Sequence, residues 1–285
     1  MSLLHEVSKE IRDIVENRKK ELELTFFEDE HIYHMRDIDG KYRNDFPSVS
    51  KVIKKFYVPF DSETKAYQMT DGNEKEMELL LEKWKNAGDY STNMGSRVHY
   101  MLETDLISRY GEYKEVRQPN FTCDTTQISK GNKMISAGNE FIDLMHQRGA
   151  VLLDTEMILG DPELGYVGQP DKCWLMFNKQ KDGFGLVITD WKTNQEKNFQ
   201  VQPYTGKMLQ PFETYHDTAL SHYFVQLPLY ARLLLKMLKG SKYENLKLLG
   251  CVVVHLKDNG TFVEYKVPSD VTNTILTIDI KKYLK

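Results

Sequence analysis

The stretch that decides the fold is residues 165–193, GYVGQPDKCWLMFNKQKDGFGLVITDWKT. Two apolar runs flank the turn-forming segment KQKDG, which predicts two neighbouring strands joined as a hairpin. Asp171 lies on one strand and Asp190 near the end of the other, so we expect their carboxylates to converge. Because side chains alternate along a strand, Asp190 and Lys192 should point to one side and Trp191 to the other. The hairpin therefore predicts two carboxylates and an ammonium at one end of a sheet.

These groups have the chemistry of a metal site. Two carboxylates and the backbone carbonyl of Trp191 form a set of oxygen ligands that suits Mg²⁺ or Mn²⁺ rather than zinc. An adjacent Lys192 ammonium can orient a water or stabilise charge on a phosphate oxygen, as metal-assisted phosphodiester hydrolysis requires. The alternative is a surface ion pair of Asp190 with Lys192, worth at most about 1 kcal/mol. The preceding run LVI should be buried, where charges need partners, and the residues alone leave both interpretations open.

Outward from this hairpin, the periodicity of apolar residues predicts one α/β domain over residues 1–285. Its mixed central β-sheet is flanked by helices, and residues 1–150 form a helical N-terminal elaboration on a core of residues 151–285. A strand at 151–159 precedes the hairpin, and a polar loop of about 25 residues follows it. The other predicted elements are helices at 3–20, 72–87, 94–108, 128–147, 219–239 and 270–283, a short helix after Pro47, an N-terminal hairpin turning at Asp39-Gly40, and a strand pair within 246–267.

Composition excludes several classes of protein. The chain has 285 residues, a net charge of −4 and three cysteines without a CxxC pair. This cysteine usage argues against a disulfide scaffold and against a four-cysteine zinc or iron–sulfur site. Apolar runs are far shorter than the roughly 18 residues of a membrane helix, and the N-terminus lacks the apolar core of a secretory signal. We therefore expect no membrane association and a cytoplasmic location, in a bacterial or phage-infected cell.

Five motifs in order resemble the PD-(D/E)xK nuclease superfamily, and within it the RecB-like exonucleases. They are Gly95-x-x-x-His99, Glu156, Gly168-Gln169-Pro170-Asp171, Asp190-Trp191-Lys192 and Gln226-x-x-x-Tyr230. The segments His31-Ile32-Tyr33 and Pro47-Ser48-Val49-Ser50 are also similar to N-terminal regions of phage exonucleases and of the mitochondrial genome-maintenance exonuclease.

The resemblance implies a restriction-endonuclease-like core and a Mg²⁺- or Mn²⁺-dependent deoxyribonuclease of DNA repair or recombination. The expected activity is that of an exonuclease on single-stranded DNA or DNA with free ends, with a metal-activated water as the nucleophile. By position, the resemblance implies that His99, Asp171, Asp190 and the Trp191 carbonyl bind the metal. It also implies that Lys192 positions the attacking water.

DNA contacts are expected around these residues. Gln226 and Tyr230 share one helical face, which the resemblance directs toward the DNA, and Glu156 is expected to lie beside the metal ligands or the substrate. Between residues 172 and 207, six lysines outnumber three acids, which predicts positive charge near the site. The loop after Lys192 interleaves lysines with aromatic residues, a pattern typical of single-strand binding. We also expect Arg97, Lys197 and Lys207 to contact the substrate.

Several alternatives stay open at this point. The chain could be a structure-specific endonuclease, or a catalytically silent DNA-binding recombination protein that keeps the nuclease fold. His99 alone has the alternative of a buried histidine bonded to a carbonyl. The aromatic residues of the polar loop have the alternative of anchoring that loop to the body of the protein.

Overall fold

The computed structural model describes residues 3–27, 30, 32–110, 116–180, 182–200 and 206–284. His31 of the N-terminal motif, Lys181 of the predicted basic segment and part of the polar loop lie outside these residues.

A mixed five-stranded sheet forms the centre of the molecule, as the sequence predicts. Its spatial order is β10-β9-β8-β7-β4, and only β8 and β9 are parallel to each other within it. The parallel pair requires a crossover between its strands, which α6 provides on one face of the sheet. The strands are β4 (Val151–Thr155), β7 (Lys172–Phe177), β8 (Phe184–Lys192), β9 (Lys247–Leu256) and β10 (Phe262–Lys266).

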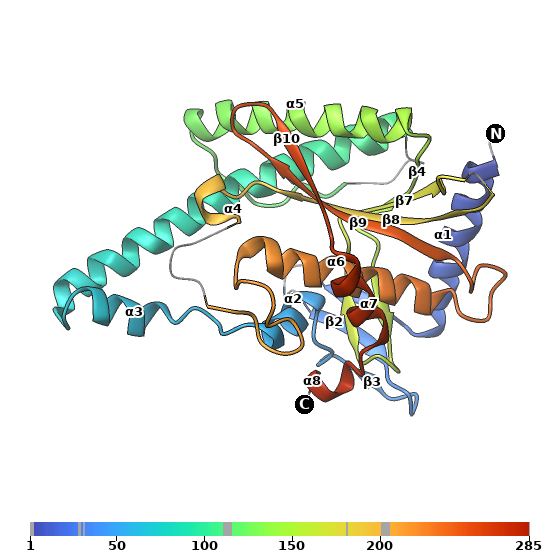
Figure 1. Cartoon of the computed structure of the whole chain (residues 1–285), viewed down its shortest axis with the longest axis horizontal. Coiled ribbons are helices and arrows are strands. Elements are labelled where there is room, and N and C mark those ends of the chain that lie inside the picture. Colours follow the sequence, from blue (N-terminus) through green and yellow to red (C-terminus); the bar gives the residue numbers. More distant parts are fainter. Residues whose placement is uncertain are drawn as a thin grey trace.

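Helices cover both faces of this sheet (Figure 1). On one face lie α4 (Glu74–Tyr110) and α5 (Thr125–Gln147); on the other lie α1 (Leu3–Glu21), α6 (Ala219–Met237) and α7 (Ser269–Thr277). The alternation of side chains supplies one hydrophobic cluster on each side: Trp174 and Trp191 pack with α4 and α5, and Cys173 and Ile188 with α1 and α6. Strands β7 and β8 read as apolar runs because both of their faces are buried.

Smaller elements surround this core. The N-terminal hairpin has a third short strand, and Gly40, with φ +77°, occupies the left-handed position of its turn. The bounds are β1 (Thr25–Phe27), β2 (Ile32–Arg36), β3 (Tyr42–Arg43), α2 (Val49–Val52), the 3₁₀ helix η1 (Ile53–Phe56), α3 (Ser62–Met69), β5 (Leu159–Asp161), β6 (Tyr166–Gly168), the 3₁₀ helix η2 (Glu196–Asn198) and α8 (Lys281–Leu284).

Several predicted elements differ in the structure. The strand expected at 151–159 is divided between β4 and β5, and the apolar run at 165–177 between β6 and β7; β5 and β6 form a separate two-stranded sheet. The helices expected at 72–87 and 94–108 form one 37-residue helix, α4, and α3 was not expected. The polar middle of α4 stays helical because the start of α5 docks on it: the Gln127 side chain donates to the Tyr90 carbonyl at 2.8 Å, and Asn93 accepts from the Thr122 amide. The expected closing helix is divided into α7 and α8.

Among the helices described here, none has both the length and the apolar character needed to span a lipid bilayer.

Candidate active site

The two aspartates meet at one end of the central hairpin, as the sequence predicts. Strands β7 and β8 pair with Lys172 opposite Thr189, so Asp171, one residue earlier, lies beside Asp190. The two carboxyl groups are close enough for each to shift the pKa of the other. The Trp191 amide also donates to Asp171 Oδ2 at 3.1 Å, which fixes that carboxylate against the end of β8.

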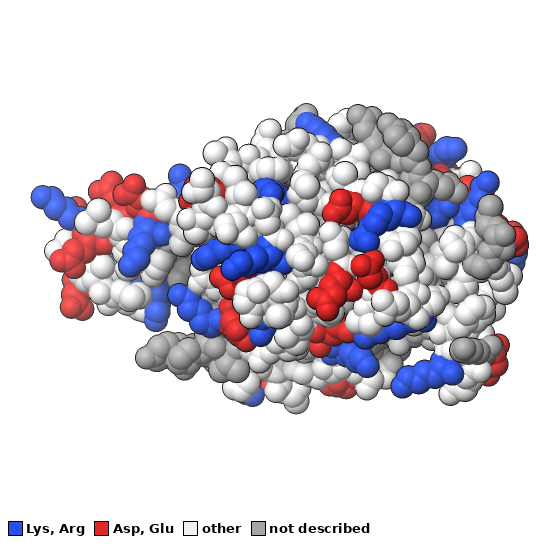
Figure 2. Space-filling model, turned by 90° about the horizontal axis from the view of Figure 1, so that it is seen from above, with Lys and Arg blue, Asp and Glu red and all other residues white. Residues whose placement is uncertain are grey.

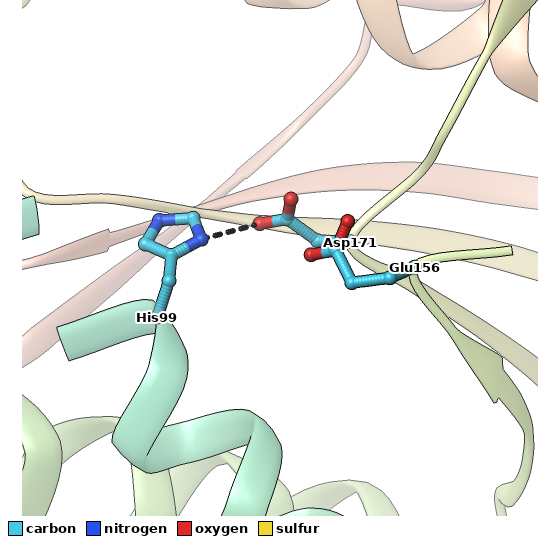
Figure 3. A group of neighbouring side chains, drawn as sticks. All are labelled: His99, Glu156 and Asp171. Carbon is cyan, nitrogen blue, oxygen red and sulfur yellow. Dashed lines mark ion pairs between the residues drawn. The ribbon is translucent and has the colours of Figure 1, made fainter. Parts of the chain in front are cut away.

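His99 reaches this carboxylate from α4 (Figure 3). Its Nδ1 lies 3.3 Å from Asp171 Oδ2, and its Nε2 lies 3.1 Å from the Trp191 carbonyl oxygen. Gly95, one turn earlier, permits this approach, because a Cβ there would lie 3.2 Å from Thr193 Oγ1. His99 thus makes the carbonyl contact expected of a buried histidine and, at its other ring nitrogen, a contact with a carboxylate.

Both contacts of His99 require a proton on the ring nitrogen that makes them. Burial lowers the pKa of His99 to about 4, so the ring is neutral at pH 7 and carries one N–H. The Trp191 carbonyl and the Asp171 carboxylate are both acceptors, and one N–H cannot satisfy both. The ring nitrogen without a proton therefore faces an oxygen, and both atoms present lone pairs to each other. A cation bound between this nitrogen and this oxygen would remove the repulsion.

Glu156 completes a group of possible ligands with His99 and Asp171. One ligand atom of each lies within 4.8 Å of the others, and Figure 3 shows the Glu156 carboxylate next to that of Asp171. Glu156 has φ +45°, a left-handed conformation that costs a non-glycine residue roughly 1 kcal/mol. Its amide donates to the Asp171 carbonyl at 3.1 Å, and its carbonyl accepts from the Gln169 side chain at 3.0 Å. These bonds hold the strained turn that directs Glu156 to the site.

A lysine accompanies each aspartate. Lys192 Nζ lies 2.8 Å from Asp190 Oδ2 and 4.4 Å from the centre of the Tyr223 ring. Lys172, which is fully buried, lies 3.6 Å from Asp171 Oδ2 and 4.5 Å from the Trp191 ring. Sequence reasoning missed Lys172 as a site residue, although a lysine inside a strand buried on both faces is itself a signal, because its charge needs a partner.

The three acidic groups fall into two classes according to the direction in which their pKa is shifted. Burial raises the pKa of Asp190 well above its usual range, and the neighbouring Asp171 adds to the rise. Burial and Asp171 raise the pKa of Glu156 in the same way. Burial acts on Asp171 too, but the Lys172 ammonium outweighs it and holds the pKa of Asp171 well below its ordinary value. The site thus contains one firmly ionised carboxylate beside two that resist ionisation until a further positive charge is near.

The residues fit a divalent cation. Asp190 Oδ1 is buried and has no hydrogen-bond partner among the residues that the structure describes. Three carboxyl groups and a backbone carbonyl are the hard oxygen donors that Mg²⁺ and Mn²⁺ prefer. A cation among His99, Glu156 and Asp171 would relieve the acceptor pair at His99, whereas Asp190 lies beside this group of three and not within it.

Gln226 and Tyr230 lie on α6 below the acidic group and are both buried. Gln226 Nε2 donates to Tyr230 Oη at 2.8 Å. Gly168 lies against the Tyr230 ring so closely that a Cβ there would be 2.7 Å from Cε1. Burial, together with Asp190, raises the pKa of Tyr230 above its ordinary range, which places the phenol in the field of the acidic residues. The two residues support the site from beneath.

The predicted basic contacts are only partly brought to this place. Lys197 lines a cavity of about 590 Å³, which we call the active-site cavity; its wall also includes His99, Lys192 and Tyr223. Arg97 instead points to α5, where it donates to Asn132 Oδ1 at 2.7 Å. The backbone of Lys207 forms an isolated antiparallel β-bridge with His216, and its side chain donates to the Thr214 carbonyl at 3.5 Å. Both contacts lie within its own loop.

Of the described lysines between residues 172 and 207, Lys192 and Lys197 line the active-site cavity, and the other three do not. Lys179 belongs to the turn between β7 and β8, at the opposite end of the hairpin from Asp171 and Asp190. Lys172 is buried beneath Trp191. Figure 2 shows Lys and Arg interspersed with Asp and Glu over the face that carries α4 and α5. Residues near one another in sequence are not all near the site, because the turn of a hairpin lies at the opposite end from the residues that begin and end it.

No protein-family model matches the chain, and a search of curated proteins finds none that matches it.

Proposed function

We propose that the protein is a metal-dependent deoxyribonuclease of RecB-like type, with the restriction-endonuclease-like core of the PD-(D/E)xK superfamily. We further propose that it acts as an exonuclease on single-stranded DNA or DNA with free ends. The observation that carries the proposal is the arrangement of His99 and Asp190. A neutral imidazole faces two acceptors, and a buried carboxylate oxygen has no partner among the described residues.

Each residue has a role that its contacts support. Asp171, Glu156 and His99, whose ligand atoms lie close together, would hold Mg²⁺ or Mn²⁺. The Trp191 carbonyl, next to His99, and Asp190, next to Asp171, would add to this set. The ion supplies Lewis-acid polarisation of the phosphate and a lowered pKa for the attacking water.

Lys192 has two constraints, the Asp190 carboxylate and the Tyr223 ring, which hold its ammonium at the edge of the active-site cavity. There it can orient a water or neutralise charge on a phosphate oxygen.

An end-labelled oligonucleotide digest tests the proposal. Wild-type protein with Mg²⁺ should shorten a labelled single strand, and EDTA should stop the reaction. Asp190→Asn should lower the rate at least about 10³-fold, since it removes a ligand and the partner of Lys192. Asp182→Asn is the matched control, because Asp182 lies in the turn at the far end of the same hairpin and accepts a hydrogen bond from Asn178 there.

Two outcomes would overturn the proposal or part of it. DNA cleavage by Asp190→Asn at the wild-type rate would remove the proposed mechanism. Cleavage of a closed circular single strand as fast as of a linear one would replace the exonuclease by an endonuclease, because an exonuclease needs an end to start from.

A further inference from the structure

A second cavity of about 420 Å³ adjoins the active-site cavity and has no role in the mechanism above. Thr193, Asn194, Gln195 and Lys197, which follow β8, line both cavities, and Ser91 of α4 does so too. The second cavity extends from this shared wall to α5 and to the turn between β9 and β10. We call it the lysine cavity, after three of its lining residues, Lys130, Lys197 and Lys257.

The lysines of this cavity are available to an anion. Lys197 is exposed and has no ion pair among the described residues. Lys257 pairs with Glu196 at 2.8 Å, but the Glu196 side chain is 72% exposed. Lys130 lies 3.7 Å from Asp258, whose side chain is 58% exposed. Exposed ion pairs of this kind are worth at most about 1 kcal/mol, so a phosphate can replace either carboxylate at small cost.

The shared wall is held in a fixed position. His255, which is buried, bonds through Nε2 to the Asn194 carbonyl at 2.7 Å and stacks on Phe199. The Tyr223 hydroxyl donates to Asn194 Oδ1 at 3.1 Å from the other side. Asn194 is therefore held from both sides, and the wall that the two cavities share is preformed.

The remaining lining suits a nucleobase. Tyr90, Met94 and Met134 supply aromatic and apolar surface, while the amides of Gln195 and Asn259 offer donors and acceptors. His255 Nδ1 is buried without a hydrogen-bond partner among the described residues and lies in the same wall. The volume falls in the range of small-molecule sites, about 300–1,000 Å³. Lysines for a phosphate beside apolar surface for a base is the pattern of sites for unpaired nucleotides.

We propose that the lysine cavity holds one nucleotide of an unpaired DNA strand whose neighbouring phosphate occupies the active-site cavity. The proposal rests on the proposed function, because that function places the scissile phosphate next to Lys192. An unpaired strand is required because α4, α5 and the β9–β10 turn wall the cavity, so that a base inside it has no room for a pairing partner. Lys130 and Lys257 then contact the phosphate of this nucleotide, and Lys197 bridges the two cavities.

Fluorescence anisotropy with a labelled 12-nucleotide single strand tests the site in EDTA, so that binding is measured without cleavage. Lys130→Ala and Lys257→Ala should each weaken binding about 3- to 10-fold. Each should also reduce the slope of log K against log salt by about 0.7, the value for one lost phosphate contact on a single strand. Lys179→Ala is the matched control: it removes an equal charge from the exposed turn at the far end of the β7–β8 hairpin, and should leave affinity and slope unchanged.

Three results would overturn the nucleotide site: no effect of either cavity variant, an equal effect of Lys179→Ala, or a blunt duplex that binds as tightly as the single strand. The nuclease proposal fails separately. A strand that binds through Lys130 and Lys257 but is not cut with Mg²⁺ or Mn²⁺ supports the nucleotide site and removes the catalytic role.

Discussion

Replacing Lys192 by methionine should leave Asp190 as a buried carboxylate without its counter-ion. The Asp190 side chain is 3% exposed, its Oδ2 accepts from Lys192 at 2.8 Å, and its Oδ1 has no partner among the described residues. Breaking a buried pair in this way costs about 3–5 kcal/mol. Because Asp190 can take up a proton instead of remaining ionised, we expect the lower end, about 3 kcal/mol, or roughly 6 °C in Tm.

The pH dependence of this loss distinguishes a buried pair from a general packing defect. Without Lys192, the folded-state pKa of Asp190 rises further above its unfolded value. A carboxyl with a raised folded pKa binds more protons in the folded state, so the stability of the variant falls as pH rises. The deficit of Lys192→Met relative to wild type should therefore be larger at pH 8 than at pH 5.

Urea denaturation in EDTA at both pH values measures the effect. Lys197→Met is the control, because Lys197 is exposed and its loss should change the free energy of unfolding by less than about 0.5 kcal/mol. Asp190→Asn combined with Lys192→Met should recover part of the loss, because the buried charge is then absent. A deficit below about 1 kcal/mol for Lys192→Met, equal at pH 5 and pH 8, would refute the reasoning.

Further predictions concern packing and acid stability. Gly168→Ala should lower the free energy of unfolding by about 1–3 kcal/mol, since its Cβ would lie 2.7 Å from both Tyr230 and Val49. Gly88→Ala, whose Cβ meets no atom within 4 Å on helix α4, should raise it by about 0.5–1 kcal/mol; thermal melts that rank the two the other way would contradict this packing. Burial lowers the pKa of His99 to about 4, so the unfolded chain binds the extra proton first, and stability should fall as pH drops from 6.5 toward 4. The His99 side chain is 31% exposed, which limits the contribution to about 1 kcal/mol; His99→Gln should lose less stability than wild type between pH 7 and pH 4.5 in urea titrations, and equal losses would exclude this role.

The meeting of Asp171 and Asp190 is predictable from sequence because it depends on local rules. A short turn fixes the register of a hairpin, and alternation fixes which side chains share a face. Both rules apply within about 25 residues, and the structure agrees with them at Trp191 and at the two aspartates.

The position of Glu156 next to Asp171 and His99 depends on features that are less local in the sequence. Its direction follows from a left-handed backbone conformation and from two hydrogen bonds, to Asp171 and from Gln169, that no periodicity reveals. The orientation of Arg97 toward α5 depends likewise on tertiary packing, because Gly131 leaves space for its guanidinium. The continuity of α4 follows from the docking of α5, which overrides the weak helix propensity of the segment around Gly88.

Direct Mn²⁺ binding tests the central claim, that these buried residues form a cation site. Titration followed by the EPR signal of free Mn²⁺ should show binding by the wild-type protein and by Asp182→Asn. Asp171→Asn removes the one carboxylate that Lys172 keeps ionised, and should weaken the affinity at least about 10-fold. Equal Mn²⁺ affinity in wild type and Asp171→Asn, or no binding by wild type at millimolar Mn²⁺, would contradict the account.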